Sequence, residues 1–203
     1  MSKSPFPPEL RTLAFVPRWS VVITTLKDNV ATHSFYVAVY GYMIAETIGW
    51  KGPRDYLMLD CLLHDNDESI TGDITGTFKD QILDAEGAGD LLFDKTAERM
   101  EGLIDAYYDL QERHPPNIIE QAEKIRLVAD KLDAVLFLIL NKRMGNTMMQ
   151  PALDGGLKSL EAAWRALPAE KEVLDRAWQT VMIPSIAAHH VRGGRGCHPS
   201  INI

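Results

Sequence analysis

Two histidines and two aspartates stand where they could hold a divalent metal ion: His33, His64, Asp65 and Asp130. His64 and Asp65 are adjacent and follow an apolar stretch, so one imidazole nitrogen and one carboxylate oxygen could bind the same ion. Asp130 lies among apolar residues, where an ionised carboxylate is costly unless a cation or strong hydrogen-bond donors replace the lost water. Together the four residues predict a metal site.

Each of these residues also has an ordinary structural explanation. A single His-Asp pair on a helix is usually accidental, and a lone histidine is often a hydrogen-bonded core residue. Asp130 could instead pair with an arginine or lie at an exposed helix edge, and Asp133, one turn further along, is an alternative ligand. The ordered combination of all four residues favours the metal site over these separate explanations.

The segments that carry the two histidines show helical periodicity. Apolar residues recur at helical spacing over residues 29–48, which places His33 in the first turns of a helix with Gly49 available to end it. Pro53 suits the first turn of a second helix, whose apolar residues run directly into His64. The C-terminal half of that second helix should therefore point towards whatever His64 binds.

A long helix is predicted from about residue 118 to 142, and its run 134–140 is apolar on every face. Such a helix should be the central one of the fold, and it carries Asp130. Helical spacing also covers residues 84–113, and one or two final helices end near Pro184. Because no strand pattern or repeat appears, the predicted fold is all-α, a compact helical bundle.

Bulk properties indicate one globular domain. A chain of 203 residues, 46% hydrophobic and 24% charged, can bury a core without disulfides. We expect a flexible lead-in at 1–9, one domain at 10–191 and a flexible tail at 192–203. Four further metal-binding side chains lie at the C-terminal end in a glycine-rich setting, which favours a loose end over a second metal site: His189, His190, Cys197 and His198.

Charge and cysteine content narrow the choice of partner and compartment. A formal net charge of −7 argues against a duplex nucleic-acid partner, because that binding needs a basic surface. A polyanionic small substrate can still bind where a cation and a few arginines or lysines reverse the local potential. Cys61 and Cys197 are expected to be free thiols in a reducing compartment. No apolar run reaches the ~20 residues of a membrane span, so we expect a soluble, cytoplasmic protein with no membrane partner.

The order His33, His64-Asp65, Asp130 resembles the HD-domain phosphohydrolase superfamily, whose motif is a first His, a later His-Asp doublet and a distant Asp on a central helix. The resemblance is greatest to small single-domain 5'-deoxynucleotidases and to phage-type deoxynucleoside triphosphate triphosphohydrolases, and it covers roughly Phe15 to Pro184. It rests on these motifs: Arg18-Trp19, Asn29-Val-Ala-Thr-His33-Ser34, His64-Asp65-Asn-Asp-Glu68, Thr71-Gly72-Asp73 and Val128-Ala129-Asp130. Ile74-Thr-Gly-Thr replaces the usual prolines after Asp73, and the segment 84–116 is longer or differently built than in that group, which bears on substrate choice.

Two acidic residues after the His-Asp doublet are candidates for catalysis. Glu68 lies four residues after His64, so on a continuing helix it would face the same side. The resemblance makes Glu68 the catalytic acid or base, whereas a solvated carboxylate at a helix end is the alternative. Asp73 follows a glycine at the expected pocket mouth, where the resemblance implies contact with a sugar hydroxyl or with water. Turn capping is the alternative for Asp73.

Three residues are candidates for substrate binding. Arg18 offers a planar fork for phosphate oxygens, and Trp19 offers a flat face for a sugar or base. A surface arginine beside a core tryptophan is the alternative explanation for this pair. Lys79 is a second candidate contact to phosphate, although an exposed lysine is the more common case.

The resemblance implies metal-dependent hydrolysis of a deoxyribonucleotide, with a 5'-monophosphate converted to deoxynucleoside and phosphate. A divalent ion lowers the pKa of a bound water and polarises a phosphoryl oxygen, and histidine ligands favour Co, Mn or Zn over Mg. One alternative is a triphosphohydrolase, for example on dATP with release of triphosphate. Another is a catalytically silent HD domain that senses nucleotides, although a sensor would not need Glu68. The resemblance also implies a homodimer or higher homo-oligomer.

Overall fold

The structure, a computed structural model, describes residues 9–73 and 107–191, and every regular element within those ranges is helical. The α-helices that follow one another along the chain are α1 (Glu9–Thr12), α2 (Val30–Thr47), α3 (Arg54–Leu63), α4 (Glu68–Thr71), α7 (Pro116–Arg143), α8 (Gln150–Arg165), α9 (Lys171–Ala177) and α10 (Ile183–Val191). The predicted all-α fold is confirmed. The predicted tail, the greater part of the predicted lead-in and most of the 84–113 helix lie outside the described residues.

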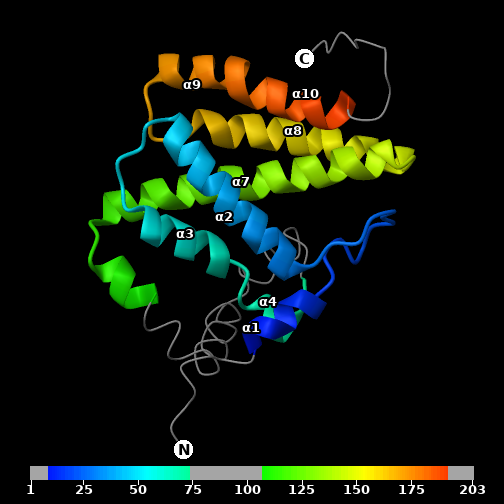
Figure 1. Cartoon of the computed structure of the whole chain (residues 1–203), viewed down its shortest axis with the longest axis horizontal. Coiled ribbons are helices and arrows are strands. Elements are labelled where there is room, and N and C mark those ends of the chain that lie inside the picture. Colours follow the sequence, from blue (N-terminus) through cyan, green and yellow to red (C-terminus); the bar gives the residue numbers. More distant parts are fainter. Residues whose placement is uncertain (1–8, 74–106, 192–203) are drawn as a thin grey trace, which may run out of the picture.

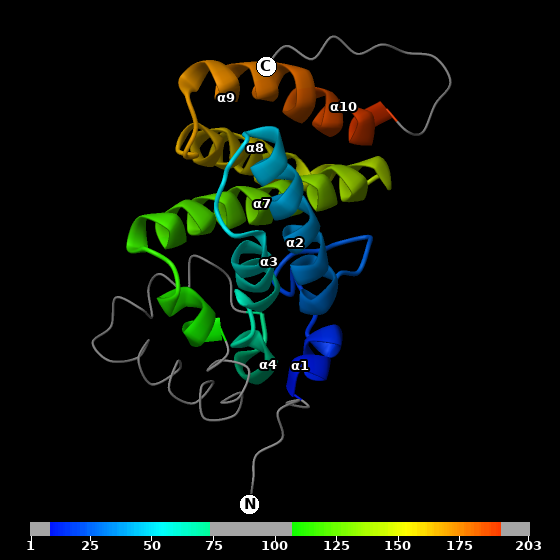
Figure 2. The same cartoon turned by 60° about the vertical axis from the view of Figure 1, so that its left-hand side comes forward.

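Helix α7, with 28 residues, is the central element, as its apolar run predicted. Helix α2 crosses it, α3 lies below it, and α8 runs alongside it (Figures 1 and 2). Helices α9 and α10 form the outer layer on the α8 side, where α9 contacts α8 and α10 contacts α7. Burying one valine, leucine or isoleucine side chain contributes about 1.5–3 kcal/mol of stability relative to leaving it exposed. The apolar residues that α7 buries are Ala122, Ile125, Val128, Ala129, Leu132, Val135, Leu136, Leu138 and Ile139.

A close approach of α2 and α3 depends on Gly41. A Cβ atom at this position would lie 2.8 Å from Sγ of the buried Cys61 and 3.9 Å from Cβ of Ala129. Glycine is therefore the residue that lets α2 pack against α3 and α7 at the same point. The Cys61 thiol is free, as expected, and burial raises its pKa well above the usual range.

A buried polar network joins α3 to α7. Asp60 accepts hydrogen bonds from Nε of Arg126 and from the hydroxyl of Tyr107, each at 2.9 Å. Burial raises the pKa of the Tyr107 hydroxyl, and the Asp60 carboxylate raises it further, so this phenol stays a donor. His64 follows Asp60 by four residues and Asp130 follows Arg126 by four. The network therefore fixes α3 against α7 one turn before both candidate ligands.

The ends of two helices differ from the sequence prediction. Helix α7 begins at Pro116, two residues before the predicted start, because a proline in the first turn needs no N–H partner. The expected end near Pro184 is wrong, since Trp178–Met182 forms a π-helical turn and α10 continues to Val191. The wider turn precedes a proline that lacks an N–H and crowds the carbonyl four residues earlier. None of the helices in residues 9–73 and 107–191 is long and apolar enough to cross a membrane.

Candidate metal centre

Helix α2 carries His33 in its first turn, and an N-cap at Asn29 fixes where this helix begins. The side chain of Asn29 accepts a hydrogen bond from the Thr32 amide at 2.9 Å, and the His33 amide donates to the Asn29 carbonyl. This start lies within one residue of the predicted one and puts His33 in the first turn. The His33 side chain is fully buried.

Helix α3 carries His64 at its C-cap, so the prediction that the C-terminal half of this helix points towards the ligand cluster is confirmed. Nδ1 of His64 donates a hydrogen bond to the Cys61 carbonyl at 2.9 Å, because a carbonyl oxygen can only accept. The proton on Nδ1 leaves Nε2 of the neutral ring with its lone pair. That lone pair is what a metal ion requires.

Two aspartates one turn apart on α7 contact opposite nitrogens of His33. Oδ2 of Asp133 accepts a hydrogen bond from Nδ1 at 2.7 Å, while Oδ1 of Asp130 lies 3.2 Å from Nε2. The alternative in which Asp133 replaces Asp130 as a ligand therefore does not fit the structure. Asp133 instead orients the His33 ring, as carboxylates commonly do behind histidines that bind metals.

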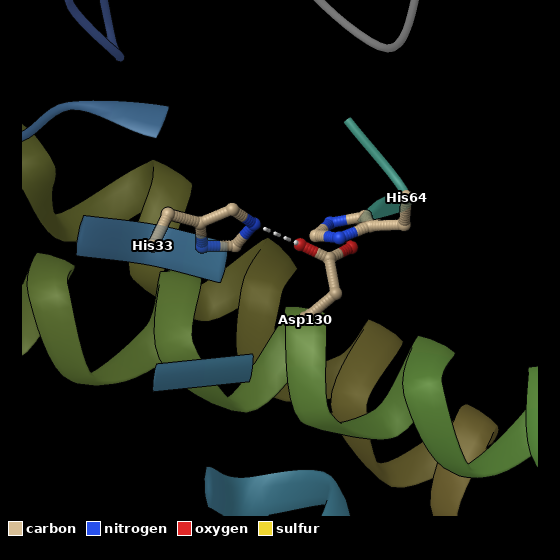
Figure 3. Close-up of side chains that lie close together, drawn as sticks. All are labelled: His33, His64 and Asp130. Atoms are coloured by element: carbon tan, nitrogen blue, oxygen red, sulfur yellow. Dashed lines mark ion pairs between the residues drawn. The ribbon is translucent and has the colours of Figure 1, made fainter. Parts of the chain in front are cut away.

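His33, His64 and Asp130 converge, each with one ligand atom within 4.8 Å of the others (Figure 3). Nε2 of both histidines is buried and makes no hydrogen bond of good geometry, although a carboxylate oxygen lies 3.2 Å from each, and a buried polar atom without a hydrogen bond is costly. The side chain of Asp130 is 34% exposed, so the cluster is open on one side. A divalent transition metal fits these atoms because it would satisfy both nitrogens and leave a position open for substrate.

Asp65 lies beside the same cluster. Its Oδ2 is 3.2 Å from Nε2 of His64 and 3.7 Å from Nε2 of His33. The group whose ligand atoms lie within 4.8 Å of one another does not include Asp65, so its predicted role as fourth ligand stays a proposal. The structure thus gathers all four residues that the sequence analysis singled out as metal ligands.

His33 forms ion pairs with the two aspartates of α7. Burial lowers the pKa of His33, but the carboxylates of Asp130 and Asp133 outweigh this effect and raise the pKa to about 9. Burial raises the pKa of Asp130, and the neighbouring His33 outweighs it, so the pKa of Asp130 falls below its usual value. A metal that binds here must therefore displace a proton from His33.

Arg18 brings the nearest described positive charge to the cluster. Its guanidinium lies 3.7 Å from Oδ2 of Asp65 and 3.9 Å from Oδ2 of Asp28, and its side chain is 13% exposed. Two carboxylates thus hold the planar group at the edge of the site. In a chain of net charge −7, Arg18 and a bound cation together could offset these carboxylates where a phosphate binds.

Trp19 has the only positive φ, 62°, among the non-glycine residues that the structure describes. A left-handed backbone costs a bulky residue about 1–3 kcal/mol and persists only where neighbours impose it. The Trp19 amide donates to Oδ2 of Asp73 at 2.9 Å, and its ring stacks on Phe137 with centroids 5.3 Å apart. These contacts fix the indole beside Arg18, and its buried Nε1 has no hydrogen-bond partner.

Glu68 and Asp73 follow the His-Asp doublet, but neither lies on a continuation of α3. The expectation of a continuing helix is wrong, because residues 64–67 form turns with bonds such as Glu68 N–H to Asp65 C=O. These three-residue turns wind more tightly than an α-helix. Glu68 is 2% exposed, which excludes the solvated carboxylate considered as its alternative. Lys79 lies outside the described residues.

One face of α7 carries more residues near the site than sequence reasoning identified. Its members recur every three or four residues in an apolar helix: Arg126, Asp130, Asp133, Phe137 and Asn141. Four of the five are polar and share one face of a helix predicted to be central, and this pattern could have identified the face from the sequence. Phe137 contacts Trp19, and Asn141 accepts a hydrogen bond from the Thr25 amide in the segment that also carries Arg18 and Trp19, so both belong to the surroundings of the site.

Solved structures share this fold. The cyanophage S-2L HD phosphohydrolase DatZ, bound to dA and one catalytic zinc ion, matches 92% of this chain and 99% of its own, with 19% identity and a TM-score of 0.68. A protein from Pyrococcus horikoshii OT3 matches 89% and 96%, with 24% identity and a TM-score of 0.62. An HD-domain phosphohydrolase from Listeria innocua matches 89% and 86%, with 16% identity and a TM-score of 0.62.

The helical fold and the His, His, Asp cluster define a metal-dependent phosphohydrolase of the HD-domain class. Residues 5–174 match the family described as 5'-deoxynucleotidase YfbR-like, and the chain belongs to this family. The resemblance deduced from the motifs is thereby confirmed, and with it the hydrolysis of deoxynucleotides. No curated protein sequence matches the chain.

Proposed function

We propose that the chain hydrolyses deoxyribonucleoside 5'-monophosphates to deoxynucleoside and inorganic phosphate. The observation that carries the proposal is the pair of buried Nε2 atoms without a hydrogen bond of good geometry beside Asp130, with the Arg18 guanidinium at the edge of the same cluster. The metal-binding atoms and the phosphate-binding group lie together, as a phosphohydrolase requires. The family supports the deoxynucleoside monophosphate as substrate.

His33, His64, Asp65 and Asp130 would hold one divalent transition metal, for which Zn, Co and Mn are the candidates. When bound, the ion polarises phosphoryl oxygens and lowers the pKa of water. The dA and zinc in the cyanophage enzyme support both a zinc ion and a deoxynucleoside product here. Elemental analysis of the purified protein should find about one metal ion per chain. Asp130→Ala should lose that metal, and retention of metal with full activity would remove Asp130 from the ligand set.

The chain's own residues would bind the substrate and move the proton. Arg18 would hold phosphate oxygens through its planar fork, and Trp19 would lie against the sugar. Glu68, buried directly after the His-Asp doublet, would act as the acid or base that serves the 5' oxygen and the attacking water. Asp73 would contribute by holding the Trp19 backbone, in addition to the sugar or water contact that the resemblance implies.

The number of phosphates on the substrate is decided by the products. Metal-loaded protein is incubated with matched dNMP and dNTP panels, and the released species are separated. Orthophosphate and deoxynucleoside from dNMP are the expected products. Tripolyphosphate from a dNTP such as dATP, with no turnover of dNMP, would replace the proposal with the triphosphohydrolase alternative. Binding of nucleotides without any turnover would instead support a nucleotide sensor.

Selectivity for deoxyribose is part of the same proposal. With Trp19 fixed against the sugar, a 2'-hydroxyl would clash or remain unpaired, and an unpaired buried hydroxyl costs about 1–3 kcal/mol, or roughly 5- to 150-fold in rate. Trp19→Ala should narrow the ratio of kcat/KM between matched deoxyribo- and ribonucleotides. Equal use of both sugars by the unchanged enzyme would remove this role from Trp19.

We also propose that the chain forms a homodimer through the outer face of α2. Aromatic and aliphatic side chains are exposed there at heptad-like spacing, and apolar patches of this kind commonly mark interfaces. They are Phe35, Tyr36, Tyr42 and Met43. Light scattering after size-exclusion chromatography should give twice the mass of 22.7 kDa. Phe35→Glu should give the monomer, whereas a monomeric unchanged protein would contradict the proposal.

A further inference from the structure

Arg18 and Trp19 lie on a loop that is closed at its base. An isolated bridge pairs Pro17 with Asn29, and we call residues 17–29 the substrate loop. The Arg18 amide donates to the Asp28 carbonyl at 3.1 Å, which holds the two ends of the loop together. The position of Arg18 and Trp19 therefore depends on what holds the rest of this loop against the helices.

The tip of the substrate loop is held by one buried amide on α7. Asn141 is fully buried, and its Oδ1 accepts hydrogen bonds from the amides of Thr25 at 2.8 Å and Leu26 at 3.0 Å. Nδ2 of Asn141 donates to the Phe137 carbonyl at 3.1 Å, which fixes the orientation of the side-chain amide. A second and exposed amide, Asn146, donates to the Ile23 carbonyl at 2.7 Å.

The preceding turn of α7 holds the start of the loop. The Trp19 ring stacks on Phe137 at an interplanar angle of 11°, and Phe137 lies one turn before Asn141. Trp19 keeps its left-handed backbone, with φ at 62°, in this arrangement. Both the indole and the loop tip are thus fixed to two neighbouring positions on the helix that carries Asp130.

We propose that Asn141 is a positioning residue for substrate selection: by holding the substrate loop on α7, it sets where Trp19 and Arg18 lie relative to the metal centre. Asn141 is eleven residues from Asp130, or about 16 Å along the helix axis, so it cannot act on the metal directly. Its side-chain oxygen accepts from the backbone of the loop, so an apolar residue of similar size would fill the core but leave the Thr25 and Leu26 amides without their acceptor. The inference rests on the proposed function, because it assigns Asn141 to the binding of the same substrate.

The test compares Asn141→Leu, which removes the acceptor at similar volume, with Asn141→Asp, which keeps an oxygen facing the two amides. Asn141→Leu should keep its metal content, raise KM for a dNMP, and narrow the deoxy-to-ribo ratio of kcat/KM at least about fivefold. Hydrogen exchange of peptides covering residues 18–28 should become faster. Asn141→Asp should restore slow exchange and most of the selectivity.

Asn146→Ala provides a variant that leaves the core untouched, because this side chain is exposed at its hydrogen bond. It should shift KM and the sugar ratio in the same direction by a smaller factor. The proposal would be overturned if Asn141→Leu or Asn146→Ala showed faster hydrogen exchange in the substrate loop but left both KM and the deoxy-to-ribo ratio of kcat/KM unchanged. Loss of metal together with an equal fall of kcat on both sugars would show a purely structural role and would overturn it as well.

Failure of the proposed function is recognised separately. If the unchanged protein does not hydrolyse any dNMP, the proposed substrate is wrong, and hydrogen exchange then reports only on the anchoring of the loop. If the unchanged protein hydrolyses dNMP selectively and Asn141→Leu behaves identically, the proposed function stands and the role of Asn141 falls.

Discussion

The two aspartates of α7 show how neighbouring residues of one type divide their roles. Asp130 faces Nε2 of His33 and Asp133 faces Nδ1 of the same ring, because they follow each other by three residues on one helix face. Asp133 fixes the tautomer and raises the basicity of the imidazole. Its contribution to metal binding therefore acts through His33.

Asp133→Asn should weaken metal binding by about 10- to 100-fold, the usual effect of removing a partner of a ligating histidine. An asparagine can still accept from Nδ1 but carries no charge. Competition with a chelator of known affinity measures the change. Asp175→Asn, on an exposed face of α9, is the matched control and should bind metal normally. Equal affinity of both variants would show that Asp133 plays no part in the site.

Metal binding should also depend on pH with a definite sign. In the metal-free protein the pKa of His33 is raised to about 9, so the ring carries a proton at neutral pH and a metal must displace it. Affinity should rise roughly tenfold per pH unit up to about pH 9 and then level off. Titration calorimetry from pH 6.5 to 9.5 follows this slope, and pH-independent binding between 7 and 9 would contradict the assignment.

Glu68→Gln should keep the metal and lose about 10²- to 10⁴-fold in kcat, the usual contribution of a positioned acid or base. The glutamine fills the same buried volume, so folding should change little. Single-turnover kinetics together with metal analysis measures both quantities. A variant without metal would make Glu68 a ligand, and an unchanged rate would make it a bystander.

At the scale of elements, three helices reach the site because they can approach one another closely. Gly41 on α2, Cys61 on α3 and Ala129 on α7 meet at one point, and each is eight or fewer residues from a candidate ligand on its own helix. The Asp60 and Arg126 pair adds a polar contact between α3 and α7 one turn before His64 and Asp130. Small residues and a buried ion pair therefore determine the distances between ligands.

Gly41→Ala should destabilise the fold by about 1–3 kcal/mol, because a new methyl group would lie 2.8 Å from Cys61 Sγ in a packed core. Gly155→Ala is the control: nothing lies within 4 Å of its Cβ, so it should stabilise α8 by about 0.5–1 kcal/mol. Urea unfolding measures both changes. The double variant Gly41→Ala with Cys61→Ala should recover stability beyond the sum of the single effects, and strict additivity would exclude the clash.

At the scale of the molecule, periodicity predicted the elements that carry the site, and the motif order predicted which residues meet. The start of α2 lies within one residue of the start that periodicity predicted, and the Asn29 side chain caps it. The end of α3 at His64 was not predicted, because sequence reasoning continued the helix to Glu68. The role of Asp133 could not be predicted, because choosing between two aspartates requires the rotation of α7 relative to His33. The anchoring of the substrate loop by Asn141 joins residues 115 or more positions apart, and a single sequence holds no signal for that pairing.

The same convergence makes metal binding a property of the whole fold. His33, His64 and Asp130 come from α2, the end of α3 and α7, so a bound ion links three elements that the unfolded chain does not hold together. Binding to the folded state alone stabilises it by about 2.7 kcal/mol at a free metal concentration one hundred times Kd. For a chain of this size that corresponds to a rise in Tm of roughly 5–11 °C. Differential scanning calorimetry of chelator-treated protein, before and after addition of zinc, measures the rise, and Asp130→Ala should abolish most of it. The exposed Asp175→Asn variant should retain the full shift. A Tm that zinc leaves unchanged in the unaltered protein, at a concentration where calorimetry detects binding, would mean that the metal binds equally to the unfolded chain and not at the junction of these helices.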